Sequence, residues 1–383
     1  MSNEIPVFMT RVECPVCKTV NDFETIKVGA YTEHGRDTDF CPTERVWRNS
    51  KYQPINPLLY FMATCSSCYY TREFNKSFKE WKSDPAFRSY RQKAVREKHL
   101  NALAGPGAPF KLLGMAMDLQ EAPNETAVVK LLLGIMDEKL LERPSYLDLG
   151  RWYLRIAWLF RELGGEAELA PSSEEVQRRR LHAMLRSLRE TCGTCEQQIE
   201  EIRKLVEQQP AVGPSTEDPC RSAVTSWRTY LHPILASVDD LLTWRSEGVA
   251  PSSLPDEAAR SSYSFGGYPS FEGFLNAVAE RDPEVPRDEQ QTISWSLLYY
   301  RRAYEETRDV SSGNQKIQVA YLIGELARRA GEIEEAWQYF NVAIRTGQEF
   351  IHEHRQDPAK TALAQRIMEL ARDQARACRG VAV

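Results

Sequence analysis

The chain has 383 residues, 42% of them hydrophobic, and carries 49 Lys and Arg against 54 Asp and Glu, a net charge of −5. This length and composition predict a globular protein of two or three units, and the charge excludes a basic field over the whole molecule that would attract nucleic acid or anionic lipid. Nine cysteines in a chain of this size favour metal binding, buried thiols or redox chemistry over the disulfide framework of small secreted domains.

The start of the chain carries no targeting signal. The residues MSNEIPVFMTRVECP contain neither a basic leader nor an apolar segment of the secretory kind. No run of about 18 apolar residues, the length needed to cross a membrane, occurs elsewhere. We therefore expect a cytoplasmic protein.

Two CxxC pairs, Cys14 with Cys17 and Cys65 with Cys68, stand near the N-terminus. At this spacing two thiolates of one tight turn can bind one edge of a tetrahedral zinc ion, and two such turns complete the ligand set. The stretches FETIKVGAY and PLLYFMATC between the pairs predict short strands that return the second turn beside the first. The sequence thus predicts a zinc-ribbon-like β module with one structural Zn²⁺ per chain, because four thiolates leave no open coordination position.

Alternatives to this metal site remain on sequence grounds. The four thiols can be unrelated buried side chains. Cys41, between the two pairs, is interpreted as a buried thiol or as an alternative ligand.

Residues 72–100 form the one locally basic stretch, with nine Lys and Arg against four Asp and Glu. Phe74, Phe78 and Trp81 recur at the spacing of one helix face. This spacing predicts a helix packed on the ribbon, with its charges in solvent; the alternative is a nucleic-acid-binding surface beside the ribbon. The break LAGPGAPF then ends a first predicted domain, residues 1–105.

From residue 110 onward the pattern is helical. Residues 320–343 have the small and aromatic residues of a tetratricopeptide (TPR) repeat at Gly324, Ala327, Gly331, Ala336, Phe340 and Ala343. A partial copy lies about 170 residues upstream, at Leu149, Gly150, Tyr153 and Ala157. Because one helix pair cannot bury its apolar face alone, we expect neighbouring helices to complete a TPR-like stack built from residues 106–170 and 291–383, with a capping helix at the C-terminus.

Residues 171–245 carry a heptad pattern between the two copies. Apolar residues recur at alternating steps of four and three from Leu181 to Val206, and again from Val224 to Leu241. Two matching seams joined by a polar break predict an inserted antiparallel coiled-coil hairpin, followed by a loop-rich linker at 246–290. Cys192 and Cys195 fall on the first seam, so we interpret them as small buried hydrophobic residues, with redox or metal chemistry as the alternative.

Five stretches resemble one known family. They are CPVC at 14–17, RDTDFCP at 36–42, NPLLYFMATCSSCYY at 56–70, LGRWYLRIAWLFRELG at 149–164 and AYLIGELARRAGEIEEAWQYFNVAI at 320–344. They are similar to a bacterial family known as domain of unknown function 2225, over roughly residues 10–165 and 292–348. The resemblance implies a zinc-ribbon-like start joined to a TPR-like helical part, and it implies no activity.

The predicted fold is therefore mainly α: a zinc-ribbon-like β module, a TPR-like helical stack and an inserted coiled-coil hairpin. The sequence contains no glycine-rich nucleotide turn, P-loop, HExxH or GxSxG. We predict a non-catalytic protein–protein interaction scaffold. One alternative is a nucleic-acid-binding protein that uses the ribbon and residues 72–100; another is a redox or metal-dependent enzyme, which requires Cys192 and Cys195 to be exposed and reactive.

The predicted partner site is the concave face of the repeat layer. In the TPR-like register the residues that face this groove are Gln318, Tyr321, Glu325 and Arg328 from the later copy, with Arg151 and Arg155 from the earlier one. Forked arginine donors and a flat tyrosine ring suit an extended peptide with acidic groups or a free carboxylate. The alternative is that these residues are ordinary surface charges or are covered by the hairpin.

Overall fold

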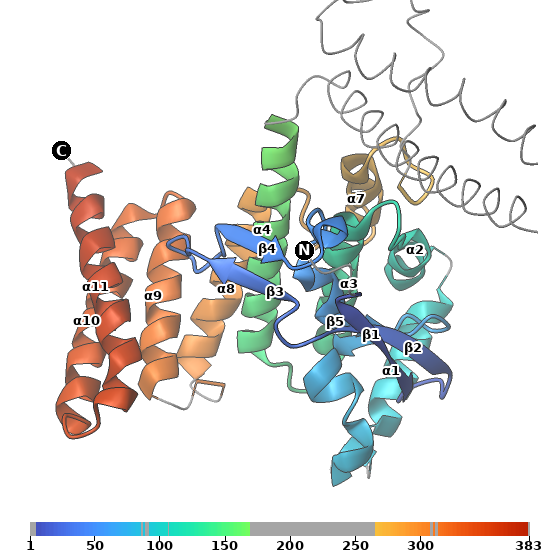
Figure 1. Cartoon of the computed structure of the whole chain (residues 1–383), viewed down its shortest axis with the longest axis horizontal. Helices are drawn as coiled ribbons and strands as arrows, with labels where there is room; N and C mark the ends of the chain where they lie inside the picture. Colours follow the sequence, from blue (N-terminus) through green and yellow to red (C-terminus); the bar gives the residue numbers. More distant parts are fainter. Residues whose placement is uncertain are drawn as a thin grey trace, which may run out of the picture. The chain divides into compact units, whose positions relative to one another are not determined.

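The computed structural model describes residues 5–85, 87–88, 92–105, 107–168, 265–306, 309–310 and 313–381 (Figure 1). The chain divides into two units, residues 1–164 with 262–383, and residues 165–261. Apart from residues 165–168, the described residues all belong to the first unit. The predicted coiled-coil hairpin, Cys192 and Cys195 within it, and the predicted linker up to residue 264 lie outside the described residues.

Three antiparallel strand pairs make up the β part of the N-terminal module. They are β1 (Val7–Glu13) with β2 (Val20–Ile26), β3 (Tyr31–His34) with β4 (Glu44–Trp47), and β5 (Met62–Thr64) with β6 (Thr71–Glu73). The turns of the first and third pairs carry the two CxxC motifs. Two 3₁₀ turns, η1 (Ser50–Tyr52) and η2 (Pro57–Tyr60), precede β5, so the strand predicted within PLLYFMATC is confined to its last residues.

The aromatic segment after β6 packs on the ribbon as predicted, but it is not one regular helix. It forms a π-helical turn, η3 (Phe74–Phe78), and a 3₁₀ turn, η4 (Trp81–Ser83), before α1 (Gln92–Ala104) begins. The side chains of Phe74, Phe78 and Trp81 are all buried. Phe74 and Phe78 belong to the apolar cluster that surrounds the cysteines.

Most of the rest of the described chain is helical. The helices are α2 (Pro109–Ala116), α3 (Pro123–Lys139), α4 (Tyr146–Glu168), α7 (Phe271–Ala279), α8 (Glu289–Glu306), α9 (Gly313–Arg329), α10 (Ile333–Glu353) and α11 (Pro358–Val381). The loop-rich linker predicted for 246–290 is wrong where α7 lies, because Phe274 and Leu275 bury that helix in the core. Over the described ranges no helix has both the length and the apolar character to cross a membrane.

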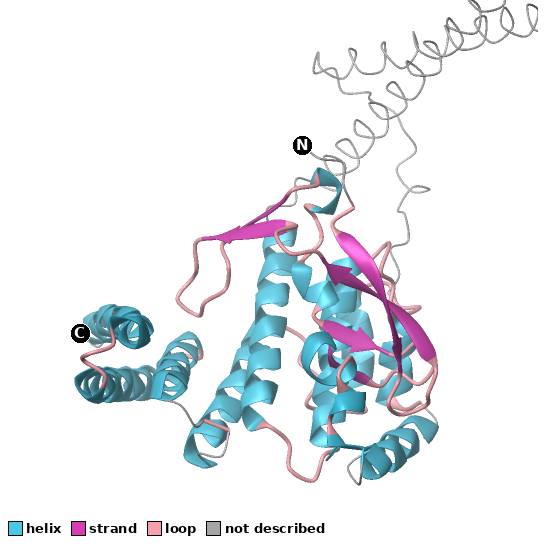
Figure 2. Cartoon of the chain, turned by 60° about the horizontal axis from the view of Figure 1, so that its bottom comes forward, coloured by secondary structure: helices cyan, strands magenta, loops and turns pink. Residues whose placement is uncertain are grey.

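Helix α4 belongs to two apolar cores. Trp152 and Tyr153 face the core built around α3, α2 and α7, whereas Leu154 and Ala157 face the core built from α8 to α11. In Figure 1 α8 lies beside α4 and α9 lies beyond α8, while α10 and α11 form the outer edge and both contact α9. Figure 2 shows the strands lying along the helices rather than forming a separate domain. The chain is thus mainly helical, with small strand pairs attached to the helices.

The helix pair α9–α10 has the close contact that the sequence pattern predicted. Gly331, in the turn between the two helices, has a φ of +85°, which favours glycine. A Cβ atom on Gly324 would lie 2.8 Å from the ring of Phe340 and 3.1 Å from the carbonyl oxygen of Ala336. Only glycine at this position allows the two helices to approach so closely.

The earlier TPR-like copy, in α4, packs against α8, which follows the predicted insertion in the sequence. Gly150 of α4 contacts the ring of Tyr300 in α8, and the Ser296 hydroxyl donates to the Gly150 carbonyl oxygen at 2.9 Å. The rings of Tyr153 and Tyr299 stack with centroids 5.5 Å apart. Helix α4 therefore pairs with a helix that is distant in the sequence. A repeat pattern sought between neighbouring helices does not detect this pairing.

Candidate functional site

The two CxxC turns bring four sulfur atoms together. The Sγ atoms of Cys14, Cys17, Cys65 and Cys68 all lie within 4.8 Å of one another. Cys14 Sγ is 3.7 Å from Cys68 Sγ, and Cys17 Sγ is 3.5 Å from Cys65 Sγ. A tetrahedral zinc ion with Zn–S bonds of about 2.3 Å places its sulfur ligands about 3.8 Å apart. The four predicted ligands therefore lie where they could hold one metal ion.

Both turns follow the same backbone path. Lys18 N donates to the Cys14 carbonyl oxygen at 3.1 Å, and Tyr69 N donates to that of Cys65 at 2.9 Å. Lys18 and Tyr69 have φ angles of +68° and +62°, in the left-handed region, which costs a residue other than glycine about 1 to 2 kcal/mol. A Cβ atom on Gly114 of α2 would lie 2.2 Å from the Tyr69 ring. Close packing of this ring on α2 holds the second turn in its strained conformation.

A buried polar chain connects the second turn to α3. His99 of α1 is fully buried, with Nε2 2.8 Å from the carbonyl oxygen of Cys68 and Nδ1 2.6 Å from Asp137 Oδ1. Burial alone would lower the pKa of His99, but the hydrogen bond and the charge of Asp137 raise it. Beside this pair, Arg72 forms a buried ion pair with Glu138. The cysteine cluster is therefore attached to the helical core through charged groups that satisfy one another.

A second attachment is the acidic loop, residues 36–42, which joins β3 to β4. Asp39 is fully buried and accepts a hydrogen bond from Arg161 Nη2 of α4 at 2.8 Å. Asp37 pairs with Arg161 at 3.1 Å and with Arg329 of α9 at 2.8 Å. Burial would raise the pKa of Asp37, but its hydrogen bond to Arg329 lowers it below its ordinary value. The two arginines thus hold an acidic segment of the same chain against α4 and α9.

This loop covers the face of α9 that was predicted to line an open groove. Tyr321 Oη donates to the carbonyl oxygen of Thr38 at 2.8 Å, and Thr38 Oγ1 donates to Glu325 Oε1 at 2.6 Å. Tyr321 and Glu325 are fully buried, and the ring of Phe40 lies against that of Tyr321. Arg328 is bonded to Glu325 at 2.7 Å and is partly exposed. The expectation that Tyr321 and Glu325 face outward is therefore wrong, because the acidic loop fills this part of the groove.

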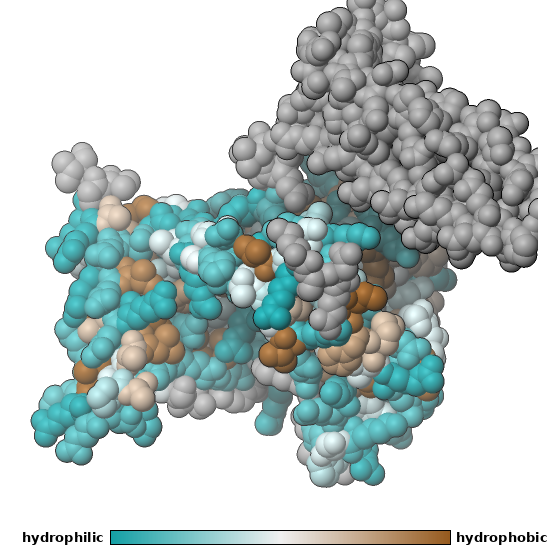
Figure 3. Space-filling model, in the orientation of Figure 1, coloured by the Kyte–Doolittle hydropathy of each residue, from teal (hydrophilic) through white to brown (hydrophobic). Residues whose placement is uncertain are grey.

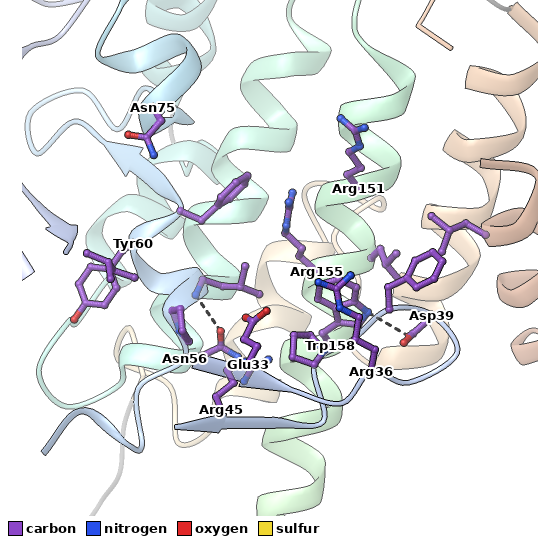
Figure 4. Close-up of a pocket in the computed structure, with 18 of the residues that line it drawn as sticks. Glu33, Arg36, Asp39, Arg45, Asn56, Tyr60, Asn75, Arg151, Arg155 and Trp158 are labelled. Atoms are coloured by element: carbon purple, nitrogen blue, oxygen red, sulfur yellow. Dashed lines mark hydrogen bonds between the residues drawn. The ribbon is translucent and has the colours of Figure 1, made fainter. Parts of the chain in front are cut away.

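Three of the six predicted partner residues lie together beside the loop. Arg151, Arg155 and Gln318 line one cavity of about 520 Å³, with Arg36 and Arg45 from the N-terminal module. Figure 4 shows Arg151 and Arg155 on successive turns of α4, with the Arg155 side chain extending into the cavity. Residues of α4 and α9 therefore line one cavity. Partner binding by these residues stays a prediction.

Arg155 is the least satisfied charge in this cavity. Over the described residues no acceptor lies within hydrogen-bond distance of its buried Nη1 atom. The guanidinium carbon lies 4.1 Å from the centroid of the Phe61 ring. Burial lowers the pKa of Arg155, and the charge of Glu73 opposes this effect. In contrast, Arg45 is paired with Glu162 at 2.7 Å.

Three aromatic residues of the basic segment 72–100 are not available to nucleic-acid bases. Arg72 is buried in its pair with Glu138. The rings of Phe74, Phe78 and Trp81 are buried, whereas stacking on a base requires an exposed ring face. These three aromatic residues are core residues of the module.

Cys41 lies outside the four-cysteine cluster. It is buried, and burial together with the charge of Asp39 raises the pKa of its thiol to about 12. A thiol in such surroundings stays protonated and unreactive. Of the two interpretations left by the sequence, the structure agrees with the buried thiol.

The sequence analysis assigned no role to His99, Asp137, Asp39 or Arg161. A signal existed for Asp39, because RDTDFCP was one of the stretches that resemble a known family. The same signal existed for Arg161, which lies in the similar stretch 149–164. His99 had none, since its contacts are made with residues 31 or more positions away.

Comparison with known proteins gives one match. A bacterial family described as uncharacterized protein conserved in bacteria (DUF2225) matches residues 7–231 and 280–376. No curated protein and no solved structure matches.

Proposed function

We propose that this chain, which belongs to the DUF2225 family of bacterial proteins, is a non-catalytic scaffold that holds a structural zinc ion. It binds a protein partner through the TPR-like part of its helices or through the predicted hairpin at 171–245. Two features support the proposal: a closed ligand set at the cysteines, and a helical layer that already holds an acidic peptide segment.

Zinc is the metal that this ligand set favours. Four thiolates at tetrahedral spacing are typical of structural zinc sites and leave no position for water or substrate. Asn21 Nδ2 lies 3.5 Å from Cys65 Sγ, and Val16 N lies 3.4 Å from Cys14 Sγ, so two N–H donors face the sulfur atoms. Such donors stabilise bound thiolates. Zinc bound here would contribute on the order of 10 kcal/mol to folding of the module.

The observation that carries the scaffold proposal is the acidic loop on α4 and α9. Arg161 and Arg329 bind the carboxylates of Asp37 and Asp39, and Tyr321 donates to the loop backbone. Arginine and tyrosine side chains thus hold an acidic segment of the same chain, although these arginines are not the ones predicted for the groove. We infer that a partner brings an acidic segment of similar character.

The surface chemistry agrees with a polar partner. The face drawn in Figure 3 is mainly hydrophilic, and its apolar side chains form small separate groups. Arg328 lies at the edge of the covered groove with about one-third of its side chain exposed. A partner segment that continues the path of the acidic loop would meet this arginine first.

Affinity capture from the native bacterium, with mass spectrometry, tests the proposal. Parent protein is compared with Arg328→Glu and with a chain in which a Gly/Ser linker replaces residues 172–244. Glutamate at position 328 repels an acidic segment, and the linker variant lacks the predicted hairpin. We expect the captured amount of a partner to fall about tenfold or more in at least one of these variants. Arg372→Glu, an exposed arginine of α11, is the matched control and should keep every partner.

Zinc content and helicity are measured on every variant, so that unfolding is not mistaken for lost binding. If both variants keep all partners of the parent, the scaffold proposal is wrong for these surfaces. If the parent captures nucleic acid instead, with affinity that falls steeply as salt rises, the nucleic-acid alternative is favoured.

A further inference from the structure

The geometry points to a binding site for a small organic phosphate in the arginine-lined cavity, with the phosphate group held by Arg155, Arg151 and Arg36. This inference goes beyond the scaffold role and does not depend on it. It rests on the charges, the aromatic lining and the size of the cavity.

The cavity has more positive charge than its own carboxylates can neutralise. The Nη1 atom of Arg155 is buried and has no hydrogen-bond partner among the described residues. Arg151 is bonded to Asp148 of its own helix, at 3.3 Å and with both groups about one-third exposed, which makes a weak pair. Arg36 is exposed and has no ion pair within the described ranges.

The acidic residues in and beside the cavity offset only part of this positive charge. Asp39 lines the wall, but Arg161 already binds its carboxylate. Glu33 is exposed, so solvent screens its charge. Glu73, which lies near Arg155, accepts a hydrogen bond from the indole N–H of Trp152 at 3.0 Å.

An unpaired guanidinium nitrogen inside a protein is unfavourable. A buried charge without a partner destabilises the folded state, and an anion that enters the site removes that cost. Arg155 also lies against the ring of Phe61, and its side chain extends into the cavity (Figure 4). The site is therefore prepared for a negatively charged ligand.

Several guanidinium groups on different elements favour phosphate over carboxylate. One arginine satisfies a planar carboxylate through two parallel hydrogen bonds. A phosphate monoester offers three terminal oxygens in a tetrahedral arrangement and carries up to two negative charges. Arg151 and Arg155 line the cavity from α4, and Arg36 lines it from the acidic loop.

The rest of the lining predicts an organic body on the phosphate. The partly buried Trp158 lines the cavity with an aromatic ring, and Asn75 and Gln318 line it with side-chain amides. Aromatic faces bind a flat ring, and amides can bond to polar atoms at its edge. A volume of about 520 Å³ lies within the usual range for small-molecule sites, about 300 to 1,000 Å³. The cavity thus suits a flat-ringed phosphate of mononucleotide size.

The test measures the thermal stability and binding heat of the full zinc-loaded chain with three probes: inorganic phosphate, phenyl phosphate and AMP. We expect phenyl phosphate and AMP to bind with a Kd of about 1 mM or lower and to raise the Tm. Inorganic phosphate should bind at least about tenfold more weakly, because it lacks the ring. Two outcomes overturn the proposal: no response to any probe, or an equal response to inorganic phosphate and phenyl phosphate.

Arg155→Met separates ligand binding from a structural role. Methionine keeps much of the side-chain volume and removes the unpaired charge, so the Tm without ligand should stay equal or rise. The response to phenyl phosphate and AMP should fall at least about tenfold. A residue needed only for folding would show the reverse, a lower Tm with binding kept, and that result contradicts the proposal.

Two further variants complete the test. Arg36→Gln changes an exposed residue and cannot disturb the core, so it remains informative if Arg155→Met folds poorly. Arg36→Gln should weaken the binding of both organic probes. Unchanged binding would contradict the proposed contact between Arg36 and the phosphate group. Arg372→Met removes one positive charge from α11, outside the cavity, and should bind like the parent.

Discussion

Lys130 shows how burial changes the pKa of a single side chain. It lies in α3 with 9% of its surface exposed, and its Nζ atom donates to the carbonyl oxygen of Leu59 at 2.6 Å. Burial lowers the pKa of Lys130 from its ordinary value of 10.5 to about 8, although the charge of Glu24 opposes the change. A neutral amine can still donate this hydrogen bond, so deprotonation relieves the charge without breaking the contact.

The pH dependence of stability should reveal this lysine. Between pH 8 and 10.5 the unfolded chain keeps the proton and the folded chain has lost it, so the free energy of unfolding contributed by Lys130 rises with pH. Below pH 8 both states are protonated and the cost of burial is present in full. We expect a rise of about 3 kcal/mol across this window.

Chemical denaturation of the parent and Lys130→Met between pH 7 and 10.5 measures this rise as the difference between the two curves. Lys111→Met, an exposed lysine of α2, is the control and should follow the parent. A constant difference between parent and Lys130→Met would show that the lysine keeps its ordinary pKa.

At the scale of elements, glycine positions determine which helices can pack closely. Gly324 lies where α9 meets Phe340 of α10, and a methyl group there would lie closer to the ring than van der Waals contact allows. Among the described residues, and leaving aside its chain neighbours and its own helix backbone, no atom lies within 4 Å of a Cβ built on Gly164 of α4. Replacement of glycine by alanine should therefore have opposite effects on stability at the two positions.

We expect Gly324→Ala to lower the free energy of unfolding by about 1 to 3 kcal/mol, because the helices must separate or the ring must move. Gly164→Ala should raise it by about 0.5 to 1 kcal/mol, because alanine favours the helix and meets nothing. Urea denaturation of the two variants measures both effects. Equal effects at both glycines would contradict close packing of α9 on α10.

The strand pairs differ from the helices in what supports them. Each has two short strands, and such a pair is marginally stable alone. The β5–β6 pair lies on α3, where Asp137 Oδ2 accepts from Thr71 N at 2.7 Å and Arg72 pairs with Glu138. The helical core therefore supports the strand pair that carries the second cysteine turn. In return, groups on this strand pair supply hydrogen-bond and ion-pair partners to the buried carboxylates of α3.

At the scale of the molecule, metal removal tests this dependence. We expect purified protein to contain about one zinc per chain, and Cys65→Ser to lose it, because one ligand of a closed four-thiolate site is gone. The Tm should fall, and the change should reach α3 through His99 and Asp137. Metal analysis and hydrogen exchange of residues 123–139 provide the two measurements.

Cys41→Ser is the matched control, since Cys41 is buried outside the cluster. It should keep the zinc equivalent of the parent. Metal-free parent protein of unchanged stability would contradict a structural role for the four cysteines.

The sequence by itself determined the local features. The CxxC spacing predicted the four-cysteine cluster, because ligands within one turn are neighbours in the chain. The small residues around Gly324 predicted the α9–α10 pair for the same reason. Burial of Phe74, Phe78 and Trp81 followed from their spacing, although the turns they form are not one helix.

Only the tertiary structure decided which distant segments meet. Nothing in the local pattern shows that α4 pairs with α8, because about 120 residues separate the two helices. Arg151, Arg155 and Gln318 line one cavity, whereas Tyr321, which the register placed in an open groove, is covered by the acidic loop. Side-chain periodicity reports which face of a helix is apolar, whereas the segment that covers a polar face is chosen by charge pairing between residues far apart in the chain.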